Sequence, residues 1–118
     1  MEDAQNRIPP LEVEKDGQQV IVHVGGEMDI DQAPLLAEAL RTLITQSDCP
    51  PEVVLDLTEL AFCDSSGLNA LLQARLTAIE HGRRISLHAP NQQVTKLLEI
   101  TGTRQLFPIT GTHEDQAE

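Results

Sequence analysis

The amino-acid sequence predicts an α/β fold: a single domain with a mixed, mostly parallel β-sheet, an N-terminal β-hairpin and helices packed mainly on one face. A chain of 118 residues that is 40% hydrophobic suits one domain with one core. Short β-branched runs alternate with segments of helical periodicity, in the order β-β-α-β-α-β-α-β. Strands that are separated by helices need crossover connections, so the later strands should run parallel.

The hairpin is predicted from two strand patterns that are joined by a turn. Residues 11–14 alternate apolar and charged side chains, and residues 20–24 form a β-branched run. Asp16-Gly17 between them indicates a tight turn, so the two strands should be antiparallel. Residues 1–10 are polar and end in two prolines, which predicts a flexible tail ahead of a domain that spans residues 11–110.

A first helix is predicted after the hairpin. Residues 25–29 should leave the sheet, because adjacent glycines permit a tight change of direction. Either Asp29 or Asp31 can cap the helix, and with Glu27 they form either a solvated acidic loop or the rim of a site. The buried stripe of this helix recurs at three- and four-residue spacing and comprises Leu35, Leu36, Ala39, Leu40, Leu43 and Ile44.

The most informative stretch lies at residues 53–79. An apolar run at residues 53–57 predicts a buried strand, and residues 58–63 are expected to be a short link. A helix is expected from Gly67 onward, with a buried stripe of Leu68, Leu71, Leu72, Leu76 and Ile79. The cluster Asp64-Ser65-Ser66 then stands at a helix N-terminus. It is either a capping motif alone or a phosphate site, because free N–H groups and the helix dipole favour negative charge there.

The rest of the chain completes the alternation. Gly82 should end the central helix, and residues 85–89 form another strand. Asn91 should cap a short helix that Gly102 stops, with Val94, Leu97 and Leu98 facing inward. Residues 106–109 predict a last short strand, at the sheet edge because of its proline. Residues 111–118 form an acidic tail.

Composition excludes several classes of function. The net charge of −11 argues against nucleic acid and anionic membranes as partners, because both attract basic surfaces. No stretch has the length of a membrane span or the pattern of a signal peptide, so we expect a cytoplasmic protein. Cys49 should lie in a surface loop and Cys63 in the packing beside the central turn, without a disulfide. The four histidines are scattered, which indicates structural roles, no metal site and no cofactor.

Three motifs in register resemble those of the STAS domain family, which includes the sulfate-transporter and anti-sigma-factor-antagonist domains. They are Phe62-Cys63-Asp64-Ser65-Ser66-Gly67-Leu68, Gly26-Glu27-Met28-Asp29, and Ala89-Pro90 through Gly102. The likeness covers about residues 11–110. The nearest resemblance is to bacterial anti-sigma factor antagonists, and it implies a STAS-like fold. Members usually carry a fourth helix where this chain has only a short polar end.

The resemblance also implies a function without catalysis. In this family the unmodified protein binds an anti-sigma factor that is also a serine kinase, and so frees a sigma factor. The kinase phosphorylates the serine that follows the Asp, and a serine phosphatase reverses this; the matching position is Ser65. The partner-binding positions that it implies are Asp29, Asp64, Ser65, Ser66 and Gly67.

An alternative function comes from the same resemblance. Stand-alone STAS domains also serve as subunits of lipid-transport ABC complexes or as other adaptors that are not phosphorylated. Such a protein would use a helix face as a permanent interface. The motif Asp64-Ser65-Ser66-Gly67 is compatible with both functions, so the sequence leaves them open. An enzyme is disfavoured, since Ser65 lacks a Gly-x-Ser-x-Gly elbow and no histidine can be assigned to it as a base.

Overall fold

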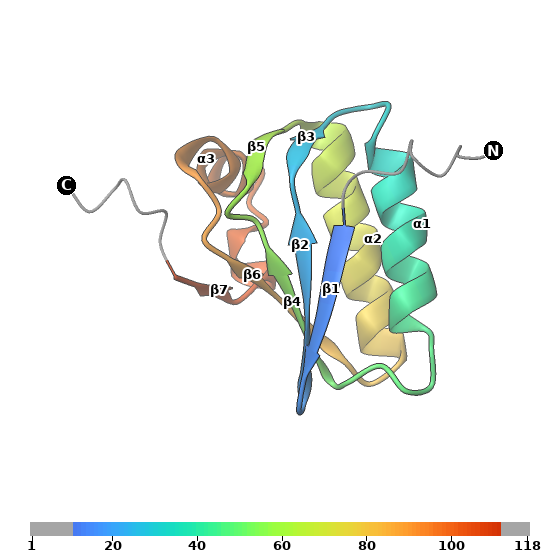
Figure 1. The fold of residues 1–118 in the computed structure, drawn as a ribbon. Helices are drawn as coiled ribbons and strands as arrows, with labels where there is room; N and C mark the ends of the chain where they lie inside the picture. Colours follow the sequence, from blue (N-terminus) through green and yellow to red (C-terminus); the bar gives the residue numbers. More distant parts are fainter. Residues whose placement is uncertain (1–10, 112–118) are drawn as a thin grey trace.

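The computed structural model describes residues 11–111 and confirms the predicted fold class (Figure 1). A five-stranded sheet has the order β1-β2-β4-β6-β7, and β3 and β5 form a second, two-stranded sheet. The predicted tails comprise residues 1–10 and 111–118, of which only Gly111 is among the described residues. The domain bounds stay a prediction.

The main sheet is mixed, as the element order predicts. β1 (Leu11–Asp16) and β2 (Gln19–Val24) form the antiparallel hairpin, and Gly17 in its turn has a φ of 67°. β4 (Glu52–Asp56), β6 (Arg84–His88) and β7 (Ile109–Thr110) add parallel strands. The last strand is shorter than predicted, because a 3-10 turn, η2 (Arg104–Leu106), takes up the residues before Phe107.

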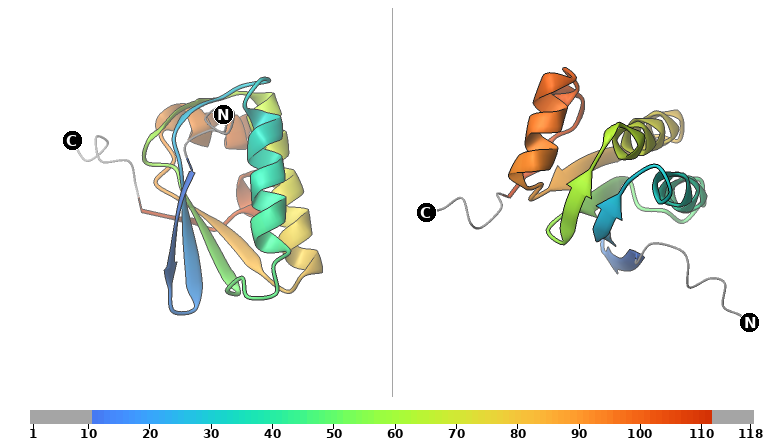
Figure 2. Two further views of the ribbon diagram at one scale, coloured as in Figure 1. Left: turned by 45° about the vertical axis from the view of Figure 1, so that its right-hand side comes forward. Right: turned by 90° about the horizontal axis from the view of Figure 1, so that it is seen from above.

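Two helices cover one face of this sheet. α1 (Ala33–Ile44) and α2 (Ser65–Glu80) lie side by side, whereas α3 (Gln92–Ile100) packs beside β5 (Figures 1 and 2). Alternate strand residues are buried beneath the helices: Val20, Val22, Val24, Val53, Leu55, Ile85 and Leu87. The residues between them point to the other face and none is buried: Gln19, Ile21, His23, Glu52, Val54, Asp56, Arg84, Ser86 and His88. We call this the open face of the sheet.

The small second sheet was not predicted. β3 (Gly26–Met28) pairs in parallel with β5 (Leu60–Cys63), where the sequence suggested a departing loop and a link. Strands of three and four residues are too short to show a period of two. The pairing matters for the site, because it fixes the loop after β3 beside the start of α2.

The predicted buried stripe of α2 was wrong at its C-terminal end. Leu76 is 52% exposed and Ile79 is 55% exposed, whereas Ala70, Ala74 and Ala78 are buried. Small side chains let α2 approach α1 and the sheet closely, and this turns the larger residues outward. α2 also begins at Ser65, two residues earlier than expected.

Other local predictions had mixed outcomes. Asn91 caps α3 through a bond from the Val94 amide, as predicted, and Gly102 has a φ of 73° at its end. Cys49 is buried, which corrects its placement in a surface loop. Cys63 is buried as expected, and both thiols are free.

Candidate functional site

Asp64 is the residue that caps α2. Its Oδ1 accepts hydrogen bonds from the backbone N–H of Ser66 at 2.9 Å and of Gly67 at 3.2 Å. Its own backbone is extended, with φ −103° and ψ −168°, as an N-cap requires. The sequence left open whether one of the serines performs this role, and the structure assigns it to the aspartate.

Ser65 is therefore released from capping. It occupies the first position of α2, its residue is exposed, and its hydroxyl makes no hydrogen bond to the described part of the chain. The N-terminus of a 16-residue helix provides a partial positive charge beside that hydroxyl. An added phosphoryl group would meet favourable backbone dipoles and open solvent, although the carboxylate of Asp64 offsets part of that charge.

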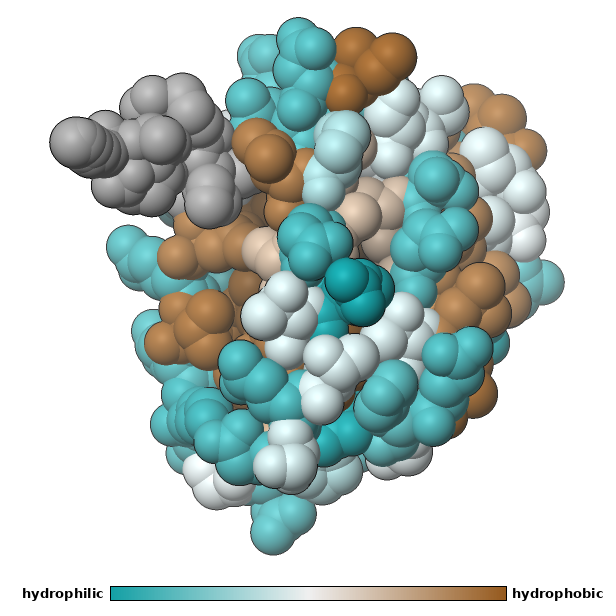
Figure 3. Space-filling model, turned by 90° about the vertical axis from the view of Figure 1, so that its right-hand side faces the viewer, coloured by the Kyte–Doolittle hydropathy of each residue, from teal (hydrophilic) through white to brown (hydrophobic). Residues whose placement is uncertain are grey.

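Ser66 is placed differently from its neighbour. It is half-buried and lines a groove between α1 and α2. The groove has a volume of about 330 Å³. Its lining is mostly small or apolar, with two amides: Ile30, Ala33, Pro34, Ala37, Ser66, Asn69, Ala70 and Gln73. Figure 3 shows this side of the molecule, where hydrophobic patches are interspersed with hydrophilic ones.

Gly67 lies beneath the site rather than on its surface. A Cβ at this position would stand 2.6 Å from the carbonyl oxygen of Met28 and 2.7 Å from Sγ of Cys63. Neither distance is compatible with a side chain, so only glycine lets the first turn of α2 approach β3. The sequence placed Gly67 among the partner-binding residues. Because it is buried, it can affect a partner mainly through the position that it gives the turn.

Asp29 is brought next to this turn by the same contact. The Asp64 amide donates to the carbonyl of Met28 at 3.3 Å, and Asp29 follows Met28 directly. Oδ1 of Asp29 accepts from the backbone N–H of Asp31 and of Gln32, each at 3.0 Å. The formal N-cap of α1 is Gln32, which makes no side-chain cap bond, so Asp29 closes the turn ahead of the helix instead of capping it. Ile30 at the tip of this loop is 71% exposed.

The start of α3 supports the site from the other side, which the sequence did not predict. The Gln93 side chain donates from Nε2 to the Cys63 carbonyl at 2.7 Å and accepts from the Cys63 amide at 2.9 Å. Nδ2 of Asn91 donates to the carbonyls of Leu60 and Ala61, each at 3.2 Å. These side chains satisfy the free edge of β5 much as a further strand would. Contacts over 30 residues of separation leave no local sequence signal.

The thiol of Cys63 is unreactive, although it lies beside the serine turn. Burial raises the pKa of its thiol to about 11, and the nearby charge of Asp64 acts in the same direction. The thiolate is the reactive form of cysteine, so this side chain packs rather than reacts.

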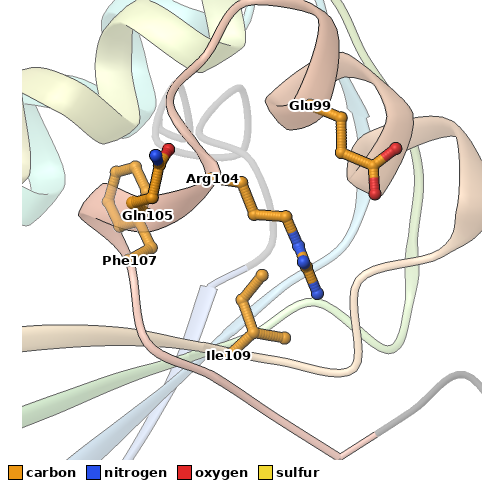
Figure 4. Close-up of a pocket in the computed structure, with 5 residues that line it drawn as sticks. All are labelled: Glu99, Arg104, Gln105, Phe107 and Ile109. Atoms are coloured by element: carbon orange, nitrogen blue, oxygen red, sulfur yellow. The ribbon is translucent and has the colours of Figure 1, made fainter.

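A second cavity, of about 460 Å³, lies between α3, η2 and β7 (Figure 4). It is lined by Glu99, Arg104, Gln105, Phe107 and Ile109, none of which belongs to the predicted site. Within residues 11–111 no cluster of His, Cys, Asp or Glu could hold a metal ion. In the same range no helix is both long and apolar enough to cross a membrane.

Comparison with known proteins identifies the family of the chain. The family model "Mlab, STAS domain" matches residues 11–108. The anti-sigma-B factor antagonist of Bacillus subtilis (strain 168) is 24% identical over 104 residues, covering 88% of this chain and 93% of that protein. The crystal structure of an anti-sigma factor antagonist from Mycobacterium paratuberculosis superposes with a TM-score of 0.72 and 28% identity, covering 90% of this chain and 88% of the other.

The antagonist SpoIIAA shares the fold in two states. Its unphosphorylated form has a TM-score of 0.73 at 21% identity, with 92% of each chain covered. Its phosphorylated form, from Bacillus, has a TM-score of 0.68 at 20% identity, with 92% of this chain and 96% of the other covered. The chain belongs to the STAS domain family. Its curated relatives are anti-sigma factor antagonists, which are regulatory binding proteins.

Proposed function

We propose that this protein is an anti-sigma factor antagonist whose binding to an anti-sigma factor is switched off by phosphorylation of Ser65. The observation that carries the proposal is the exposed Ser65 hydroxyl, which Asp64 frees from the task of capping α2. The relatives named as antagonists support the role, and SpoIIAA, known in unphosphorylated and phosphorylated forms, supports the kind of switch.

The switch works through an interface rather than through the fold. A phosphoserine adds about −1.5 to −2 charges at neutral pH. Within the domain, the N-terminus of α2 offsets part of that charge. A partner surface that is complementary to a neutral hydroxyl would instead contact a larger phosphoryl group, whose charge it could not pair. A loss of about 3 kcal/mol at one contact lowers affinity roughly a hundredfold, so binding can be toggled with little change in the backbone.

The surface around Ser65 offers a second source of affinity. The groove between α1 and α2 opens beside Ser66, with exposed Ile30 at its edge and the methyl groups of Ala33 and Ala37 along it. An apolar side chain of the anti-sigma factor would fit such a lining. The partner would be an anti-sigma factor with serine kinase activity, which brings its own ATP, and a serine phosphatase would restore the hydroxyl.

Paired substitutions at the two serines test the proposal. Ser65→Ala should bind the anti-sigma factor as the unmodified protein does, and Ser65→Asp should bind at least tenfold more weakly, as measured by calorimetry. Incubation with the kinase and ATP should add one phosphoryl mass to the wild type and to Ser66→Ala, but none to Ser65→Ala. Equal affinity of the two Ser65 variants, or phosphate on Ser66, would refute the assignment.

The second candidate is a STAS subunit of a lipid-transport ABC complex or another adaptor that is not phosphorylated. It is favoured by the apolar residues that α2 exposes, Leu76 and Ile79, since a permanent interface would cover such a helix face. For this function neither Ser65 variant should change partner binding, whereas Leu76→Ser with Ile79→Ser should abolish it. The two candidates thus differ in which end of α2 the partner needs.

A further inference from the structure

A titratable cluster crosses three neighbouring strands on the open face of the sheet. His23 of β2 lies between Glu14 of β1 and Asp56 of β4. Its Nδ1 is 2.8 Å from Oδ2 of Asp56, and its Nε2 is 3.1 Å from Oε2 of Glu14. The scattered histidines of the sequence indicated structural roles. The partners of His23 lie 9 and 33 residues away from it, so no local pattern reveals the cluster.

The two contacts of the ring match the hydrogen-bonding pattern of its protonated form. A neutral imidazole has one N–H, and a carboxylate can only accept, so a neutral His23 could satisfy one of these contacts and not both. Only the imidazolium donates to both carboxylates. Asp56 is held as a carboxylate, because its Oδ1 accepts from the amide and the hydroxyl of Thr58.

The surroundings of the ring are mostly acidic. Glu12 is the register partner of His23 on β1, and Asp56 is its register partner on β4. Beyond Asp56, on β6, lies His88, whose Nδ1 contacts the Thr110 hydroxyl at 3.2 Å. The arginine of this face, Arg84, lies at the opposite end of β6 and faces Glu52 at 3.8 Å. Apart from His88, the charged groups that face His23 within residues 11–111 favour its protonated form.

We propose that the His23 imidazolium is a proton-dependent clasp that ties β1 to β4 across β2, and that the clasp opens when the ring loses its proton. β1 needs such a tie more than the inner strands do. It is an edge strand, Leu11 is its one half-buried residue, and Val13 is 49% exposed. Side chains of β1 therefore contribute little apolar packing to hold the hairpin on the sheet.

The direction of the effect follows from the pKa of His23. Burial lowers it, but the hydrogen bonds and charges of Glu14 and Asp56 outweigh burial and raise the pKa above 6.5. A raised pKa in the folded state means that the clasp is fully formed below about pH 6.5 and is lost as the pH rises through the folded value. The clasp thus opens on the alkaline side.

Titration of the full chain by NMR tests the clasp. The His23 pKa should exceed 6.5, and Glu14→Gln and Asp56→Asn should each lower it. Between about pH 6 and about pH 9, protection of the β1 amides against hydrogen exchange, corrected for the intrinsic rate, should fall several-fold. His23→Gln should remove that dependence, and His81→Gln should not.

Two results would overturn the proposal. One is a His23 pKa at or below 6.5. The other is β1 protection in the wild type that varies with pH as it does in His23→Gln. Should His23→Gln fail to fold, Glu14→Gln decides alone, because Glu14 is exposed and its substitution leaves the sheet intact. An unchanged His23 pKa in Glu14→Gln also counts against the clasp.

Discussion

At the scale of single residues, the site depends on the carboxylate of Asp64 and on the lack of a side chain at Gly67. Asp64 satisfies the amides of Ser66 and Gly67, and so leaves the Ser65 hydroxyl to solvent. Gly67 lets α2 meet the backbone of Met28, which sets Asp29 beside the turn. Both residues can therefore influence partner binding indirectly, through the positions that they give Ser65 and Asp29.

Gly67→Ala should be costly although it adds only a methyl group. That group would stand 2.6 Å from the Met28 carbonyl oxygen, so the backbone has to shift. We expect a loss of about 1–3 kcal/mol in the free energy of unfolding, measured with urea. Asn69→Ala, an exposed change two residues further along α2, should stay within about 0.5 kcal/mol. If Gly67→Ala were as stable as Asn69→Ala, the backbone around Met28 would accommodate a methyl group at residue 67 at little cost, contrary to this prediction.

At the scale of elements, the sequence was most reliable where one strong pattern set the structure. The β-branched runs predicted β2 and β4, and Asn91 and Gly102 marked both ends of α3. It failed where tertiary contacts decide. Hydrophobicity alone chose Leu76 and Ile79 for the buried side of α2, whereas close helix packing selects its alanines. Ser65 could be placed at a helix start from local spacing, but its support from α3 could not.

Gln93 provides the test of that support. Gln93→Leu would leave the amide and the carbonyl of Cys63 unpaired at the edge of β5. We expect the free energy of unfolding to fall by about 1–3 kcal/mol, with faster hydrogen exchange at the Cys63 amide. Gln92→Leu is the matched control, because Gln92 is exposed in the same turn of α3. If both variants unfold at the same urea concentration, α3 does not brace the serine turn.

At the scale of the whole molecule, the acidic residues fall into two regions of the surface. The chain has 19 acidic and 8 basic residues, for a net charge of −11. One group of acidic residues lies on β3, on the loop that follows it and at the serine turn: Glu27, Asp29, Asp31 and Asp64. The other lies on the open face of the sheet, around the clasp. Composition gave the total charge from the sequence, but only the strand order and register could show how it is distributed.

We predict that, under the proposed function, the anti-sigma factor approaches the first of these regions with a basic surface. Association should then slow as salt rises, by about tenfold or more between about 50 and about 500 mM, while dissociation changes little. Glu27→Gln with Asp31→Asn should flatten this dependence in stopped-flow measurements. Glu12→Gln with Glu52→Gln removes the same charge from the open face and should flatten it less. Equal slopes for the two double variants would mean that the net charge, and not the acidic rim of the serine turn, steers the partner.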